Sequence, residues 1–203
     1  GLAISERMNA QVRGMNVAIR NANDAISLSQ TAEGALGKVG DMLQRMRELA
    51  VQSANATNGT SDRANLNAEY QALGTEVVRT LANTKFNGLA ILGANAGTLS
   101  FQVGANAGET VDVVTTRLDT AGSITGATGG AITDATLAGT AMTNIDTALT
   151  AVNGERALYG ATQNRFDAII GTLQVAAENQ AAAKSRITDA DFAAETANLS
   201  RAQ

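Results

Sequence analysis

Few residues in this chain could carry out chemistry, because its 203 residues include neither cysteine nor histidine. Thiol nucleophiles, imidazole bases, disulfides and Cys/His metal sites are therefore excluded. Carboxylate chemistry remains open, carried by 19 Asp and Glu residues. Two carboxylates held on opposite sides of a cleft could act as general acid and base. A catalytic or metal site in this protein would have to be built from these acids.

Two short patterns approach known sites but lack parts that the chemistry needs. Asp189 and Asp191 have the spacing of the first two ligands of a calcium loop, but the downstream Gly and bidentate Glu are missing. Gly126, Gly129 and Gly130 lie near a phosphate-loop spacing, but no Lys-Ser or Lys-Thr follows them. We interpret the two acids as helix caps and the glycines as a consequence of composition. The sequence therefore predicts no catalytic residue, no metal site and no cofactor.

Long helices are the elements that must position any functional side chain. Between Leu2 and Ser53, apolar or small residues recur at steps that alternate almost strictly between four and three. This spacing is typical of a coiled-coil seam and predicts one uninterrupted helix over about 2–54. The seam residues are Ile4, Met8, Val12, Met15, Ile19, Ala22, Ile26, Ser29, Ala32, Leu36, Val39, Leu43, Met46, Ala50 and Ser53.

A second helix, over about 61–83, is predicted after a polar turn. Asn58-Gly59 is a strong turn signal, and Ser61 is the expected N-cap, with Asp62 in the first helical turn. Because the turn is short, the second helix should return antiparallel along the first. Its apolar stripe comprises Leu66, Tyr70, Leu73, Val77 and Leu81.

The middle of the chain changes to a period of two, which indicates strands. It predicts a β-hairpin with strands at about 98–103 and 110–116 and one buried face. The inward residues of this hairpin are Leu99, Phe101, Val103, Val111 and Val113. The segment Ala121 to Gly139 is rich in Gly, Ala and Thr. We interpret it as an irregular surface connection with one short strand near Ile132.

The heptad pattern returns over about 140–184 and predicts another long helix. Arg156 and Gln163 are polar positions on its seam; they either fix the register and partner or extend to solvent. A break is predicted at 185–191, with Thr188 or Asp189 capping a final helical piece. The fold class is therefore mainly α: an elongated antiparallel bundle of long coiled-coil-like helices with a β-hairpin. The seam residues are Met142, Ile145, Leu149, Val152, Arg156, Tyr159, Gln163, Phe166, Ile170, Leu173, Ala177 and Gln180.

Charge and chain ends give further expectations. The net charge of -4 is spread along the chain, which argues against nucleic acid and membranes as partners. No run of 18 apolar residues occurs. The chain begins at Gly1 and stops at Gln203 inside helical patterns, so we expect both ends to be trimmed.

Several runs of residues resemble bacterial flagellin. In the first helix these are 20–27, 31–36 and 43–54, all similar to the amino-terminal region of that family. Phe86-Asn87-Gly88 follows in the family's order. Later runs that match in the same order are Gln102–Asn106, Gln163–Phe166 and Ser200–Gln203. The resemblance covers nearly all of the chain except 121–139.

The resemblance implies a fold and a structural function. It implies a single elongated rod domain, 1–203, with an amino-terminal helical hairpin (1–88), a β-hairpin with an irregular connection (89–139) and a carboxy-terminal helix with the following segment (140–203). Members of the family pack side by side with other flagellin subunits in the extracellular, secreted flagellar filament that serves motility. The short segment 121–139 stands where many members insert outer domains. An export chaperone is an implied partner of the full-length form.

The resemblance also implies a receptor-binding patch. The segment from Gln44 to Gln52 resembles the site recognised by the animal toll-like receptor that senses flagellin, an innate immune recognition. Arg45 and Leu49 would be its central contacts, and Glu69 would complete it. Because Arg45, Leu49 and Gln52 are spaced four and three apart, they share one helix face. That face is offset from the seam by about one position, so all three are expected to be exposed.

A different class of function remains as an alternative. A flagellin-like protein of the cell surface could bind an extracellular ligand such as a polysaccharide, through the surface of 121–139. Sugar sites normally need exposed aromatic side chains. Tyr70, Tyr159 and Phe166 fall on helix seams instead and are predicted to be core residues.

Overall fold

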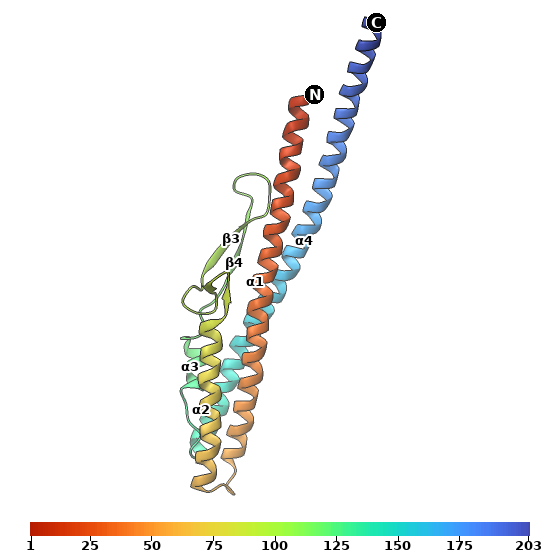
Figure 1. The fold of residues 1–203 in the computed structure, drawn as a ribbon. Coiled ribbons are helices and arrows are strands. Elements are labelled where there is room, and N and C mark those ends of the chain that lie inside the picture. The colour runs from red at the N-terminus through yellow and green to blue at the C-terminus, as the bar shows by residue number, and fades with distance from the viewer. The chain divides into compact units, whose positions relative to one another are not determined.

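The computed structural model describes all residues from 1 to 203, and Figure 1 shows its helices and strands. The helices are α1 (Leu2–Ala54), α2 (Thr60–Asn83), α3 (Gly122–Thr128) and α4 (Ala135–Ala202). The strands are β1 (Lys85–Phe86), β2 (Leu89–Ala90), β3 (Thr98–Gln102) and β4 (Thr110–Val114). The predicted mainly α fold with a β-hairpin is confirmed. None of the helices combines the length and the apolar character that crossing a bilayer would require.

Helix α1 has the bounds that its heptad pattern predicts, whereas the cap of α2 differs from the prediction. The N-cap of α2 is Gly59, and Ser61 lies inside the first turn. Gly59 takes this place because the Asp62 carboxylate, three residues later, accepts the Gly59 backbone N–H at 3.0 Å. Such a bond satisfies an amide at the helix start that has no partner within the helix.

Helix α4 is longer at both ends than predicted, and the predicted break at 185–191 is wrong. The helix begins at Ala135 because the Asp134 carboxylate caps it by accepting the Leu137 backbone N–H at 2.7 Å. It continues through the segment 185–191, which contains neither Gly nor Pro to stop it. The Thr188 hydroxyl shares a hydrogen bond of 3.1 Å with the Ser5 hydroxyl instead of capping a new helix.

The segment 121–139 is not an irregular surface connection. It contains helix α3 and has no strand near Ile132. Ile124, Ala127 and Ile132 are fully buried. The Ala127 carbonyl accepts the Tyr70 hydroxyl at 2.8 Å, so the segment packs on α2. The prediction failed because small residues, read as a loop signal, here permit close packing of backbone against helix.

The chain forms two compact units. Unit 1 comprises Gly1–Ile26, Ser100–Val113 and Gln163–Gln203, and unit 2 comprises Ser27–Leu99 and Val114–Thr162. Both α1 and α4 therefore contribute residues to both units. A single domain over 1–203, divided at 88 and 139, stays a prediction.

In unit 1, the first part of α1 and the last part of α4 run antiparallel. Besides the bond between Ser5 and Thr188, the Lys184 ammonium donates to the Asn9 side-chain carbonyl at 3.2 Å. Moving forward along α1 therefore means moving backward along α4. The β3–β4 hairpin alternates as predicted, with outward Ser100 and Asp112 exposed. The inward Phe101 ring meets Phe166 edge-on at 5.8 Å.

In unit 2, parts of α1 and α4 pack with α2 and α3, and α2 lies alongside α1 (Figure 1). Arg63 of α2 donates through Nε to the Ser53 carbonyl of α1 at 2.8 Å. Arg156 of α4 donates to the Glu33 carboxylate of α1 at 2.8 and 2.9 Å while its side chain stays 40% exposed. This seam position therefore both pairs with a neighbouring helix and reaches solvent. The β1–β2 ladder follows α2, with Lys85 opposite Ala90 and Phe86 opposite Leu89.

Candidate functional site

The five residues of the predicted patch come from two neighbouring helices of unit 2. Gln44, Arg45 and Gln52 on α1 are exposed, as is Glu69 on α2. Leu49 is only 1% exposed. The structure therefore brings Arg45 and Glu69 together at the surface, but the prediction that Leu49 is exposed is wrong.

Leu49 is buried because this part of α1 has two helical neighbours. Arg45 of α1 pairs with Glu69 of α2, and Arg47 of α1 pairs with Asp146 of α4. A helix that contacts two others buries a wider stripe than the two positions per heptad of a simple coiled-coil seam. The fully buried residues here are Leu43, Met46, Leu49, Ala50 and Ser53.

Arg45 is the centre of the exposed part of the patch. Its Nε donates to Glu69 Oε1 at 3.0 Å and its Nη2 to Glu69 Oε2 at 3.3 Å, a two-pronged arrangement. Its Nη1 donates to Glu48 Oε2 at 3.2 Å. The hydrogen bond to Glu69 and, to a smaller extent, the one to Glu48 raise the pKa of the Arg45 guanidinium. The side chain remains 50% exposed, so the guanidinium is both oriented by two carboxylates and open to a partner.

Three residues beside this patch, Arg47, Glu48 and Val51, were not among its predicted contacts. Gln44, Arg47, Glu48 and Val51 line a shallow hollow of about 270 Å³. Arg47 donates to Asp146 Oδ1 at 2.8 Å, and this bond raises the pKa of Arg47. The spacing of Arg45 and Glu48, three residues apart on a helix, was the signal for one contact. No local pattern announces the contact between Arg47 and Asp146, which lie 99 residues apart.

The turn between α1 and α2 sets which residues of the two helices meet. Arg63 donates to the carbonyls of Ser53 and Asn55 at 2.8 and 3.1 Å, and these carbonyls lie at the end of α1. The Asn58 side chain donates to the Gln52 and Asn55 carbonyls at 2.6 and 2.9 Å. The end of α1 is therefore capped by side chains from the following turn and helix. These bonds hold Glu69 in register with Arg45.

This surface carries charged and amide side chains that can form hydrogen bonds and ion pairs. No group of three or more acidic side chains lies close enough together to hold a metal ion. Asp189 and Asp191 are exposed residues inside α4, so the predicted capping role is wrong and no loop surrounds them. Tyr70, Tyr159 and Phe166 are buried, as predicted. Burial raises the pKa of Tyr70 to about 12, and burial together with the Glu155 charge raises that of Tyr159.

Comparison with protein families gives two matches along the chain. The model of the bacterial flagellin N-terminal helical region matches residues 1–96. The model of the bacterial flagellin C-terminal helical region matches residues 142–203. The two matches bracket the β3–β4 hairpin and α3, and they include all of the Arg45 patch.

Individual relatives and solved structures agree with the family matches. A flagellin of Halalkalibacterium halodurans is 48% identical over 201 residues, which cover 99% of this chain and 74% of that protein. Flagellin D of Vibrio anguillarum is 32% identical over an alignment that covers 100% of this chain and 81% of that protein. The crystal structure of Bacillus cereus flagellin matches with a TM-score of 0.67 and 34% identity, covering 81% of this chain and 94% of that one.

Proposed function

Because this chain belongs to the bacterial flagellin family, we propose that it packs side by side with like subunits through apolar residues on its long helices. Membership in the family makes the chain a structural component of the extracellular flagellar filament and not an enzyme. The proposal concerns which surfaces of the helices make the subunit contacts.

Exposed apolar side chains on α1 and α4 support this proposal. Leu158 is 60% exposed and Val175 is 58% exposed, although both lie in the interior of α4. Large apolar side chains that remain exposed on a folded chain often mark surfaces that another protein covers. The others on these two helices are Leu2, Ile4, Val17, Val51, Leu137, Phe192 and Leu199.

Charged substitutions at these positions test the proposal. We expect cells whose gene carries Leu158→Glu or Val175→Glu to yield far fewer filaments after shearing, because a carboxylate would lie in an apolar contact. Ala157→Glu and Gln174→Glu are matched controls, since each adds the same group at an exposed neighbouring position. Circular dichroism of the purified variants checks that the helices persist. Normal filament yields from both test variants would contradict the proposed surface.

We further propose that the Arg45 patch is the part of this chain that the flagellin-sensing toll-like receptor recognises. The resemblance of Gln44 to Gln52 to the family's recognised segment motivates this proposal. The exposed contacts would be Arg45, Glu69 and Gln52, with Glu48 beside them. Buried Leu49 would support the patch from beneath instead of contacting the receptor. Recognition would be a by-product of residues that serve subunit packing.

Removal of the Arg45 guanidinium tests the receptor proposal. We expect Arg45→Ala to weaken receptor signalling by about tenfold, because Arg is a frequent hot-spot residue whose oriented bonds are lost. Arg79→Ala is a matched control, since Arg79 also forms an exposed pair with an acid three residues away on its own helix. Signalling is measured in a receptor reporter cell line, and melting checks the fold. Equal signalling by Arg45→Ala and Arg79→Ala would rule out a central role for Arg45.

The remaining partners rest on the family alone. An export chaperone for the full-length form stays a proposal that binding to the purified chaperone would test. For the alternative of a surface protein that binds a polysaccharide, Tyr70, Tyr159 and Phe166 offer no exposed ring, because all three are buried. Calorimetric titration with surface glycans would show such binding.

A further inference from the structure

Three Asn-Gly pairs occur in the chain, at 58–59, 87–88 and 153–154, and each lies in a different structural setting. An Asn followed by Gly can lose its side-chain amide spontaneously, a reaction called deamidation. The Gly backbone nitrogen attacks the Asn side-chain carbonyl carbon, the bond to the side-chain nitrogen breaks, and ammonia leaves with the proton from the backbone nitrogen. Water then opens the cyclic imide to aspartate or isoaspartate. The reaction needs no enzyme and consumes only water.

The fold protects two of the three pairs. Asn153 and Gly154 lie in the interior of α4, where backbone N–H groups donate to carbonyls four residues earlier and the backbone is fixed. The Asn58 side-chain nitrogen donates to the Gln52 and Asn55 carbonyls, and the Gly59 backbone N–H donates to Asp62. In both pairs, formation of the cyclic imide must first break hydrogen bonds. These bonds lie at the start of α2 for Asn58-Gly59 and within α4 for Asn153-Gly154.

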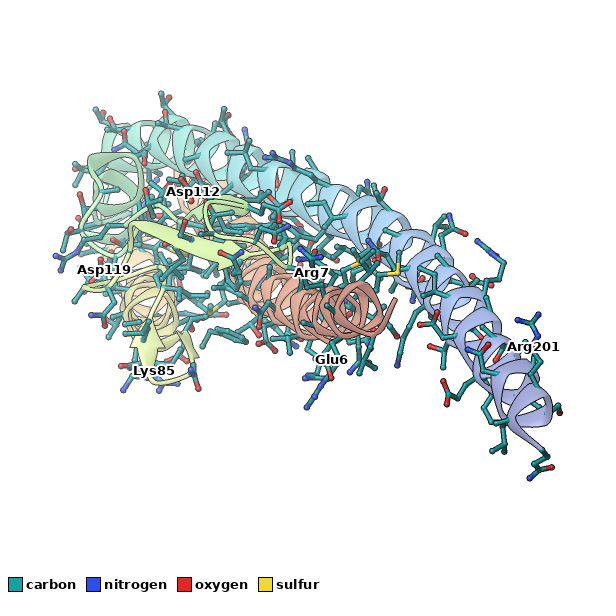
Figure 2. All side chains as sticks on the ribbon, turned by 90° about the horizontal axis from the view of Figure 1, so that it is seen from above. Glu6, Arg7, Lys85, Asp112, Asp119 and Arg201 are labelled. Carbon is teal, nitrogen blue, oxygen red and sulfur yellow. The ribbon has the colours of Figure 1, made fainter.

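The pair Asn87-Gly88 has none of this protection. It forms the two-residue turn between β1 and β2, and both residues are exposed. The Asn87 side-chain amide and the Gly88 backbone N–H make no hydrogen bond in this structure. A Cβ placed on Gly88 would have no atom within 4 Å, so no other part of the chain packs against this side of the turn. Figure 2 labels Lys85, which opens this hairpin.

The backbone of this turn also differs from that of the other two pairs. Asn87 has a φ of 54° and Gly88 a φ of 81°, so both lie in the left-handed region. Residues with a side chain rarely adopt this region. Asn87 is the one non-Gly residue of the chain with positive φ. From these observations we propose that Asn87 is a site of spontaneous conversion to aspartate and isoaspartate in the folded protein, while Asn58 and Asn153 are protected.

The conversion would change the hairpin in two ways. Each event adds a negative charge at an exposed turn, close in sequence to Lys85. Isoaspartate also adds one carbon to the main chain of a two-residue turn whose register sets Lys85 opposite Ala90. Ala90 and the following Ile91 are buried, so a shift of this turn would be felt by the core of unit 2. Modification would therefore accumulate with age and loosen the segment after α2.

Peptide mapping tests the proposal with internal controls. Cleavage after Lys and Arg places the three pairs on three different peptides, 48–63, 86–117 and 118–156. The full chain is incubated in mildly alkaline buffer, digested briefly, and each peptide is followed by mass spectrometry and by enzymatic methylation of isoaspartate. We expect the reaction at Asn87 to outrun that at Asn153 by at least about a hundredfold, because Asn153 must wait for local unfolding of α4.

Two controls separate the fold from the local sequence. In denaturant all three pairs should react at similar rates, because the protection is lost. Asn87→Asp should remove the ammonia release of peptide 86–117 and leave the other two peptides unchanged. Reaction at Asn58 or Asn153 as fast as at Asn87 in the folded chain would overturn the proposal. So would a rate at Asn87 that is as slow as at Asn153.

Discussion

Arg45 and Leu49 lie one helical turn apart on α1 and have opposite environments. Arg45 is oriented by Glu69 and Glu48 and remains half exposed. Leu49 is buried among the residues that α1 turns toward its two neighbours. In the proposed receptor recognition, Arg45 would form direct bonds to the partner. Leu49 would act by holding the helix that presents Arg45.

A residue-scale prediction separates these two effects. We expect Leu49→Ala to lower the free energy of unfolding by about 2–5 kcal/mol, because it removes buried methyl groups and leaves a cavity. Leu158→Ala is the matched control: Leu158 is 60% exposed, and its truncation should change the free energy by less than about 0.5 kcal/mol. Urea unfolding followed by circular dichroism measures both. Equal stability of Leu49→Ala and the unmodified chain would show that Leu49 is not packed as described.

At the scale of elements, glycines mark where helices do and do not touch another part of the chain. Gly34 is an exposed residue in the middle of α1, and a Cβ added there would have no atom within 4 Å. Gly74 lies in α2, where an added Cβ would lie 2.8 Å from the Thr128 carbonyl oxygen at the end of α3. Gly34 destabilises α1 and has no packing role, whereas Gly74 lets α3 approach α2 closely.

The two glycines should therefore respond in opposite directions to the same substitution. We expect Gly34→Ala to raise the free energy of unfolding by about 0.5–1 kcal/mol, since Ala loses less backbone entropy in a helix. Gly74→Ala should lower it by about 1–3 kcal/mol, because the methyl group overpacks a tight contact. Thermal melts of both variants in parallel measure the change. If Gly74→Ala melts as high as the unmodified chain, α3 does not pack as closely on α2 as described.

At the scale of the whole molecule, charge and apolar surface act against each other during self-association. The net charge of -4 repels copies of the chain, while exposed residues such as Leu158 and Val175 favour contact. Salt screens the repulsion, because the Debye length falls from about 30 Å at ~0.01 M to about 8 Å at ~0.15 M. Apolar contact does not weaken in the same way.

Association should therefore increase as salt is added. We expect light scattering and sedimentation to report larger species when sodium chloride is raised at neutral pH. Leu158→Glu should show a smaller increase than Ala157→Glu, although the two variants carry the same net charge. A decrease of association with salt would mean that opposite charges, instead of apolar residues, make the contacts between subunits.

The sequence by itself determined the elements whose pattern is local. The alternation of steps of three and four, without Pro, predicted one uninterrupted helix for α1, and the Asn58-Gly59 turn signal predicted where it ends. The alternation over 98–114 gave the hairpin, and the seam positions of Tyr70, Tyr159 and Phe166 gave their burial. Long runs of residues gave the family. Arg45 and Glu69 were also predicted to meet, because a short turn returns α2 along α1.

Tertiary structure alone decided what depends on distant neighbours. Heptad spacing describes a helix with one partner, so it placed Leu49 outside the seam; contacts with both α2 and α4 bury it. Small residues in 121–139 have no periodic signal, and they pack because Gly74 lets the end of α3 approach α2 closely. Whether a residue is buried depends on its neighbours in space, and those neighbours come from segments that lie far apart in the sequence.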